Sequence, residues 1–328
     1  MRSFRSGGTP ARRSRAAPGP RGGGTASSGG HRDRPGTPPP QSHDVRQTEM
    51  SRSAMPFTLS HPAAILPLIR HPFVAPALIA GSMAPDVPVF ARIQATEAVW
   101  WEPLFNQTHT HSAAGAVGVD LGYALGLMGL YLLLRRPVLA LVPPLAARAG
   151  IREAGEPRPH GRGPAGALRL ALWTGLSALI GIVTHIVWDS FTHYQMFFHK
   201  NVAFMSTEVI GGLDVLRLLQ HLSTVAGLLI IGVLLLRRWR ATPPTPLTGS
   251  AVLTAPARSV VLAVLAVAAA GGAAWGLTEP YATASLEHAA REIASGGGLV
   301  LTVTLMLYAI GRHVFLSLHR NVSGSPGA

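Results

Sequence analysis

Long, uninterrupted runs of apolar residues dominate the chain, and the spacing typical of amphipathic helices or strands is scarce. A helix needs about 20 residues to cross the hydrocarbon core of a bilayer. Five runs approach or reach that length before a charged residue or a helix breaker ends them, so the sequence predicts an all-α, polytopic membrane protein. The five predicted spans cover residues 113–134, 168–187, 218–236, 260–277 and 299–318.

A shorter apolar piece, from Phe73 to Ala84, precedes the first predicted span. Pro72, Pro76 and Pro85 bound or interrupt it, and proline removes a backbone donor and clashes with the preceding helical turn. We therefore expect a short re-entrant or buried helix here and not a sixth span.

Composition agrees with this class, since 48% of the residues are hydrophobic and only 13% are charged, against about 25% charged in soluble domains. The chain has no cysteine, which excludes disulfides, thiolate zinc sites, iron-sulfur clusters and cysteine nucleophiles. Any metal must then be bound by His, Asp, Glu or main-chain groups. Neither a glycine-rich phosphate loop nor a nucleophile elbow is apparent, which disfavours nucleotide-driven transport.

The formal net charge of +13 is unevenly distributed. Residues 1–54 hold ten arginines against three acidic residues and are rich in Gly, Pro and Ser, which predicts a disordered tail and gives no support for nucleic-acid binding. Two interpretations stay open: a real basic tail, or translation that begins at Met55. We divide the chain into this tail, a motif-bearing membrane domain over residues 55–240, and a C-terminal pair of spans over residues 241–328.

Arginine also predicts the orientation of the spans, because positively charged loops stay in the cytoplasm. The loops over residues 135–167 and 237–259 are rich in arginine, whereas the loops after the second and fourth spans hold few cations. We expect a multi-pass protein of the inner (plasma) membrane. The start of the first span and the end of the second would then face outward.

Several histidines and aspartates fall at that outward face. His185, Asp189 and His193 close the second span, and positions i, i+4 and i+8 share one face of a helix along two turns. A histidine and a carboxylate one turn apart are suitably spaced to bind one divalent ion. The alternative is a helix that leaves the membrane with its polar side chains in interfacial water, beside Trp188.

Three further candidates rest on weaker local patterns. His109 and His111 lie two residues apart before the first span, which suits an extended or turning segment, and His111 is preferred because it abuts the span. Asp86 lies between two prolines and has a second interpretation as a turn former. His61 precedes a proline at the start of an apolar helix, where a purely structural role is the alternative.

Asp120 falls within the first span, where a carboxylate is costly unless it is paired or faces a polar interior. We expect it to reach the candidate ligands or a polar group on another span. Gly118, Gly122 and Gly126 lie at four-residue spacing on the same helix, and such a small-residue face predicts close helix contact.

Three motifs occur in order along the chain: MPFTLSHPAA at residues 55–64, GSMAPD at 81–86 and HIVWDSFTH at 185–193. Together they resemble the bacterial membrane family catalogued as domain of unknown function 4184, over approximately residues 55–240. More remotely, the order of the histidines and aspartates is similar to that in membrane-bound metal-dependent hydrolases and in the zinc-dependent phospholipase C and P1 nuclease group. That group's free N-terminal tryptophan amine and later His-x-x-x-Glu or His-x-x-x-Asp pair have no recognisable counterpart here. The resemblance implies six metal ligands, which are His61, Asp86, His111, His185, Asp189 and His193.

The leading hypothesis is a membrane-embedded, metal-dependent hydrolase that acts on a phosphate ester or a lipid-type substrate at the outer face. The cofactor would be a divalent metal, zinc by ligand type. Asp86 and Asp189 would be the catalytic groups, bridging metals or orienting water. Membrane lipids would surround the protein, and a lipid or lipid-linked phosphate would be the substrate. The competing hypothesis is a non-enzymatic membrane protein that binds a metal, conducts an ion or acts as a scaffold.

Overall fold

The computed structural model describes residues 58–92, 101–148, 163–194, 196–245 and 253–323. The predicted tail over residues 1–54 and part of the loop over 135–167 lie outside the described residues. Among the described residues, helices dominate and the sheet is a two-stranded antiparallel ribbon.

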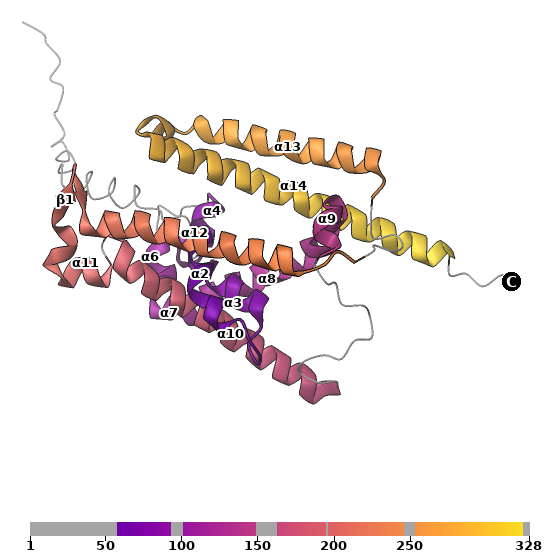
Figure 1. Cartoon of the computed structure of the whole chain (residues 1–328), viewed down its shortest axis with the longest axis horizontal. Coiled ribbons are helices and arrows are strands. Elements are labelled where there is room, and N and C mark those ends of the chain that lie inside the picture. Colours follow the sequence, from indigo (N-terminus) through magenta and orange to yellow (C-terminus); the bar gives the residue numbers. More distant parts are fainter. Residues whose placement is uncertain (1–57, 93–100, 149–162, 195, 246–252, 324–328) are drawn as a thin grey trace, which may run out of the picture.

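In the part of the chain that the structure describes, five long helices are apolar enough to cross a membrane, which confirms the predicted number of spans (Figure 1). They extend beyond the apolar runs in the sequence, because polar residues continue each helix past its hydrophobic part. The chain is thus an all-α polytopic membrane protein. The long helices are α8 (Val119–Leu141), α10 (Gly163–Thr192), α12 (Val215–Ala241), α13 (Ala255–Leu277) and α14 (Leu286–Ser323).

Short elements precede and connect the long helices. The short helices are η1 (Thr58–Ser60), α2 (Pro62–Ile65), η2 (Leu66–Leu68), α3 (Ala75–Gly81), η3 (Ala84–Asp86), α4 (Val87–Phe90), α5 (Glu102–Phe105), α6 (Gln107–Thr110), α7 (Ala113–Val117), α9 (Pro143–Ala146), α11 (Phe197–Asn201), η4 (Ala203–Ser206) and η6 (Pro280–Thr283). The strands are β1 (Glu208–Ile210) and β2 (Leu213–Asp214).

The apolar piece before the first span forms the short buried helix α3, as predicted. It packs against α10 and α8. A Cβ atom on Gly81 would lie 2.1 Å from the carbonyl oxygen of Ala178, and one on Gly181 would lie 2.3 Å from that of Leu78. The backbones of α3 and α10 therefore touch, and each helix contributes a glycine that permits the contact.

Small apolar side chains fill the junction of α3, α7, α8 and α10. Because most of them are alanines, the helices approach closely without large gaps to fill. Ala84 lies two residues before Asp86, and Ile182 lies three residues before His185, so this junction fixes the backbone beside two of the candidate ligands. The buried cluster consists of Ala77, Ala80, Ala84, Ala116, Ala124, Ala178 and Ile182.

The prediction that the glycines of the first span make a close helix contact is wrong among the described residues. A Cβ atom on Gly122 or Gly126 would meet no atom within 4 Å. Gly118, with φ −108° and ψ −97°, instead separates α7 from α8. The face of α8 that packs carries Ala124, which is two positions from Gly122 and Gly126 and thus lies roughly 200° around the helix from them.

The last two long helices, α13 and α14, lie side by side (Figure 1). A Cβ atom on Gly276 would lie 2.0 Å from the carbonyl oxygen of Glu292, so this pair too is in backbone contact. Arg92, just after α4, joins the pair to the N-terminal elements. Its guanidinium lies 2.9 Å from a carboxylate oxygen of Glu279 and 2.8 Å from one of Glu292.

Candidate metal centre

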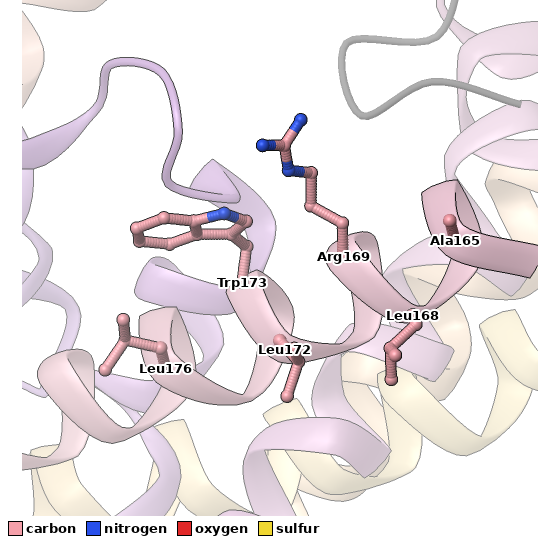
Figure 2. A pocket seen from close by; sticks show the side chains of 6 residues that line it. All are labelled: Ala165, Leu168, Arg169, Leu172, Trp173 and Leu176. Atoms are coloured by element: carbon pink, nitrogen blue, oxygen red, sulfur yellow. The ribbon is translucent and has the colours of Figure 1, made fainter.

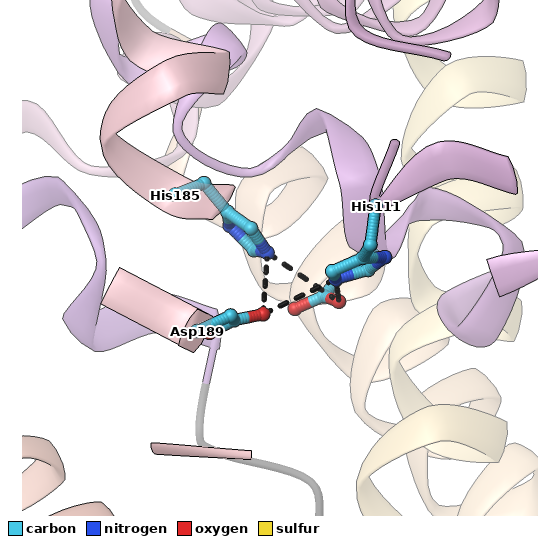
Figure 3. Close-up of side chains that lie close together, drawn as sticks. His111, His185 and Asp189 are labelled. Carbon is cyan, nitrogen blue, oxygen red and sulfur yellow. Dashed lines mark hydrogen bonds and ion pairs between the residues drawn. The ribbon is translucent and has the colours of Figure 1, made fainter. Parts of the chain in front are cut away.

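The six residues predicted as ligands gather at one end of the bundle, where the N-terminal elements meet the end of α10. We call these six residues the His/Asp cluster. Figure 3 shows three of them, from two separate parts of the chain, with their side chains directed at one another. Their positions are His61 before α2, Asp86 at the end of η3, His111 after α6, His185 and Asp189 on α10, and His193 just beyond its last residue.

Asp189 is the centre of the cluster, because its two oxygens contact four imidazoles. Nε2 of His61 and Nδ1 of His193 lie 2.8 Å and 3.2 Å from Oδ1. Nε2 of His111 and Nε2 of His185 each lie 3.1 Å from Oδ2. The helical spacing therefore brings His185 and His193 to one carboxylate, as predicted, with two imidazoles at each oxygen.

Asp86 faces the same centre from a different element. Its Oδ1 lies 3.6 Å from Nε2 of His111 and 3.7 Å from Nε2 of His185. Its Oδ2 accepts a hydrogen bond of 2.5 Å from the Thr58 hydroxyl. One donor atom each from Asp86, His111, His185 and Asp189 lies within 4.8 Å of the others, so this four-donor group is suited to hold a metal ion.

Three of the imidazoles are oriented through their second nitrogen. In each, Nδ1 faces a backbone carbonyl, and because a carbonyl only accepts, Nδ1 carries the hydrogen. When such a ring is neutral, its lone pair is on Nε2. Metal-binding histidines are commonly oriented in this way. The hydrogen bonds run from His61 to Thr58 (3.2 Å), from His111 to Gln107 (3.0 Å) and from His185 to Ser82 (2.8 Å).

These three Nε2 atoms face carboxylate oxygens, which have no hydrogen to donate when ionised. Lone pairs at about 3 Å repel unless a proton or a cation lies between them. Nε2 of His185 has no hydrogen-bond partner among the described residues, although its side chain is fully buried. A divalent cation fits this arrangement, because it accepts all of the lone pairs and neutralises the buried carboxylates.

The cluster is buried but not sealed. The side chains of His185 and Asp189 are 0% and 2% exposed, whereas those of His111 and His193 are 13% and 15% exposed. Access from outside is therefore by way of His111 and His193.

Burial by itself lowers the pKa of His111. The hydrogen bond to Asp189 and the charge of Asp86 raise that pKa by more than burial lowers it, so the net pKa is above the ordinary 6.5.

Asp86 and His61 both contact other members of the cluster. Asp86 precedes α4 without capping it by a side-chain hydrogen bond, and its Oδ2 accepts from the Thr58 hydroxyl, which does not fit the interpretation as a turn former. His61 is 1% exposed and contacts Asp189, which is 128 positions away in the sequence. The sequence did not predict the orienting groups Thr58, Ser82 and Gln107, since all three act through backbone carbonyls that no residue type reveals.

Other polar candidates lie outside the four-donor group. His109 belongs to the single helical turn of α6, so the segment turns and is not extended, and His109 diverges from His111. Asp120 is fully buried, and neither of its oxygens has a hydrogen-bond partner among the described residues. Asp214, the last residue of β2, caps α12, where its side chain accepts from the backbone N–H of Arg217.

An apolar hollow of about 420 Å³ lies on the N-terminal half of α10 (Figure 2). Arg169 and His185 are 16 positions apart, which corresponds to roughly 24 Å along a helix. The hollow is thus separate from the His/Asp cluster. Its lining residues are Ala165, Leu168, Arg169, Leu172, Trp173 and Leu176.

Comparison with known proteins gives one match. A family described as "Domain of unknown function (DUF4184)" matches residues 55–311. The match includes all six residues of the cluster and extends past the region of sequence resemblance into α14. No curated protein and no solved structure matches the chain. The resemblance to metal-dependent hydrolases stays a prediction.

Proposed function

Since the chain belongs to the DUF4184 family, whose description names no activity, we propose a function from the geometry of the His/Asp cluster: a membrane-embedded, metal-dependent hydrolase. One observation carries this proposal. Lone pairs of oriented histidines converge on two buried carboxylates, and Nε2 of His185 has no hydrogen-bond partner among the described residues. Such an arrangement is costly in a protein that binds no cation.

The ion would be held by the four-donor group of Asp86, His111, His185 and Asp189. Imidazole and carboxylate ligands without sulfur suit zinc, and we propose zinc as the ion. A divalent ion there would polarise a phosphoryl or ester oxygen and lower the pKa of water. The chain's own contribution is orientation, since Thr58 fixes Asp86 and the carbonyl of Ser82 fixes His185.

Partial exposure supports hydrolysis over a purely structural site. A structural zinc site is closed by its ligands, whereas a catalytic one keeps a position open for water or substrate. His111 and His193 are the partly exposed members of the cluster and mark the side from which a substrate would enter. Asp86 is our candidate to orient water, since no hydrogen bond to its Oδ1 occurs among the described residues, and Asp189 is our candidate to fix the imidazoles.

The ends of the long helices support an outward-facing site in the plasma membrane. Arg135 and Arg136 lie near the end of α8, and Arg237, Arg238 and Arg240 lie near the end of α12. The cluster lies at the opposite end, near the start of α8 and the end of α10. With arginine on the cytoplasmic side, the cluster would lie near the outer headgroups, where a lipid or lipid-linked phosphate ester is the substrate class within reach.

The test combines metal content with hydrolysis of a phosphodiester. The full chain, purified in detergent, would be analysed for zinc by mass spectrometry and assayed on bis(p-nitrophenyl) phosphate and on a fluorescent phospholipid in mixed micelles. We expect metal-dependent hydrolysis that a chelator abolishes and zinc restores. We also expect that Asp86→Asn lowers the rate about a hundredfold or more, and that His185→Ala removes most of the metal.

His221→Ala is the matched control, because His221 is an exposed histidine on α12 that is outside the cluster. It should keep both the metal and the activity. Bound zinc without hydrolysis of either substrate would favour the non-enzymatic alternative. Protein that binds no zinc, manganese or cobalt would contradict the metal centre itself.

A further inference from the structure

The four-donor group leaves two histidines of the cluster unexplained. His61 and His193 contact Oδ1 of Asp189, whereas His111 and His185 contact Oδ2. An ion bound at Oδ2 therefore leaves a second set of donors at the other oxygen. On the basis of the metal-dependent function proposed above, we propose that the cluster holds two metal ions bridged by the carboxylate of Asp189.

His61 is positioned in the same way as His185, which belongs to the four-donor group. Both are about 1% exposed, and both direct Nδ1 at a backbone carbonyl. Nε2 of His61 lies 2.8 Å from Oδ1 of Asp189, and in the neutral ring its lone pair repels the carboxylate unless a proton or a cation lies between them. An ion at Oδ2 does not relieve that repulsion, whereas a second ion at Oδ1 does.

The two rings also have the separation that a pair of ions requires. The imidazoles of His61 and His185 are stacked with their centroids 4.1 Å apart and an angle of 18° between their planes. Nearly parallel rings that each bind a separate ion place those ions at a similar spacing. Hydrolytic two-metal sites have ions about 3.5–4 Å apart, so the stacking matches a carboxylate-bridged pair.

His193 completes the second set of donors. It lies one helical turn after Asp189, and its Nδ1 is 3.2 Å from Oδ1. Its side chain is 15% exposed, so this side of the centre is reached from outside. The second ion would thus have two imidazoles and one carboxylate oxygen as protein ligands, which leaves room for a substrate oxygen or water.

The charge of such a centre indicates the class of substrate. Two divalent ions against the carboxylates of Asp86 and Asp189 leave two positive charges uncompensated by the ligands. An anionic group is therefore favoured next to them, and a phosphate ester supplies both the charge and oxygens that reach two ions. A neutral carboxylic ester lacks that charge, so we assign phosphate esters as the substrate class.

The number and coupling of bound ions test this inference. The full chain in detergent would be loaded with Mn²⁺, desalted, and analysed for manganese per chain and by electron paramagnetic resonance. We expect two ions per chain and the spectrum of an exchange-coupled pair. His193→Ala, a partly exposed position whose loss leaves the buried core intact, should retain one ion per chain with an uncoupled six-line spectrum.

The variants separate this inference from the proposed function. His61→Ala should also reduce the content to one ion, and His221→Ala should keep two. One uncoupled ion in both the unmodified chain and His193→Ala would overturn the two-ion centre and leave the single-ion function standing. Two ions in both would overturn the assignment of His193. A chain that binds no metal would contradict both proposals.

Discussion

Replacing Gly81 with alanine perturbs the contact on which the position of the cluster depends. The added Cβ would lie 2.1 Å from the carbonyl oxygen of Ala178, against a lower limit of 3.0 Å for real Cβ contacts. Helix α3 must then move away from α10 by roughly 1 Å or more, a form of overpacking that typically costs about 1–3 kcal/mol. Gly81 does not have a positive φ, so the effect arises from packing and not from backbone strain.

The displacement should also weaken metal binding, because α3 leads directly into site residues. The carbonyl of Ser82, the next residue, orients His185, and Asp86 follows four residues later. Metal–ligand distances tolerate shifts of only about 0.2 Å, and loss of an orienting contact commonly weakens binding about 10–100-fold. We expect Gly81→Ala to lower the melting temperature and to weaken zinc affinity about 10–100-fold.

Thermal unfolding in detergent and a competition titration with a fluorescent zinc chelator would measure the two effects. Gly122→Ala is the matched control, since its Cβ would meet no atom within 4 Å. The control should leave both quantities unchanged. A Gly81→Ala protein with unaltered melting temperature and zinc affinity would refute the described contact between α3 and α10.

Three further results are expected. Because the pKa of His111 is raised in the metal-free protein, zinc must displace a proton there: affinity should weaken as the pH falls through that pKa, and calorimetry in buffers of different ionisation enthalpy should detect proton release. pH-independent affinity would contradict this. Asp120→Asn should retain full metal content and should not be less stable, because an unpaired buried carboxylate typically costs about 1–3 kcal/mol or more; loss of metal would instead identify Asp120 as a ligand. In intact cells an impermeant maleimide should label Thr207→Cys but not Arg152→Cys, and the reverse pattern would invert the orientation.

The parts of the fold that follow from local sequence were predictable. Hydropathy alone located the five spans, and the prolines around α3 indicated a short buried helix. Helical spacing placed His185 beside Asp189, because residues one turn apart share a face in any helix. Asn106 and Ser112 are also readable signals, since each accepts a backbone hydrogen bond at the start of a short helix. They mark the starts of α6 and α7, whereas the first span was predicted to start too early because the sequence did not reveal the break at Gly118.

What could not be predicted depends on contacts between distant parts of the chain. His61 and Asp86 each have an ordinary local interpretation, and their contacts with the cluster appear only when α2 and η3 pack beside α10. Glycine spacing has the same limitation. Gly122 suggested a helix contact that is not present among the described residues, whereas Gly81 and Gly181 form one from unremarkable positions. Spacing reveals which residues share a face but not which face is covered.

X-ray absorption at the zinc edge tests the metal centre most directly. The measurement would use the zinc-loaded full chain in detergent, with His185→Ala for comparison. We expect nitrogen and oxygen ligands at about 2.0–2.2 Å, imidazole scattering that decreases in His185→Ala, and a zinc–zinc distance of about 3.5–4 Å. Zinc that shows no imidazole scattering, or that gives the same spectrum in His185→Ala, would contradict the assignment of the His/Asp cluster as a metal centre.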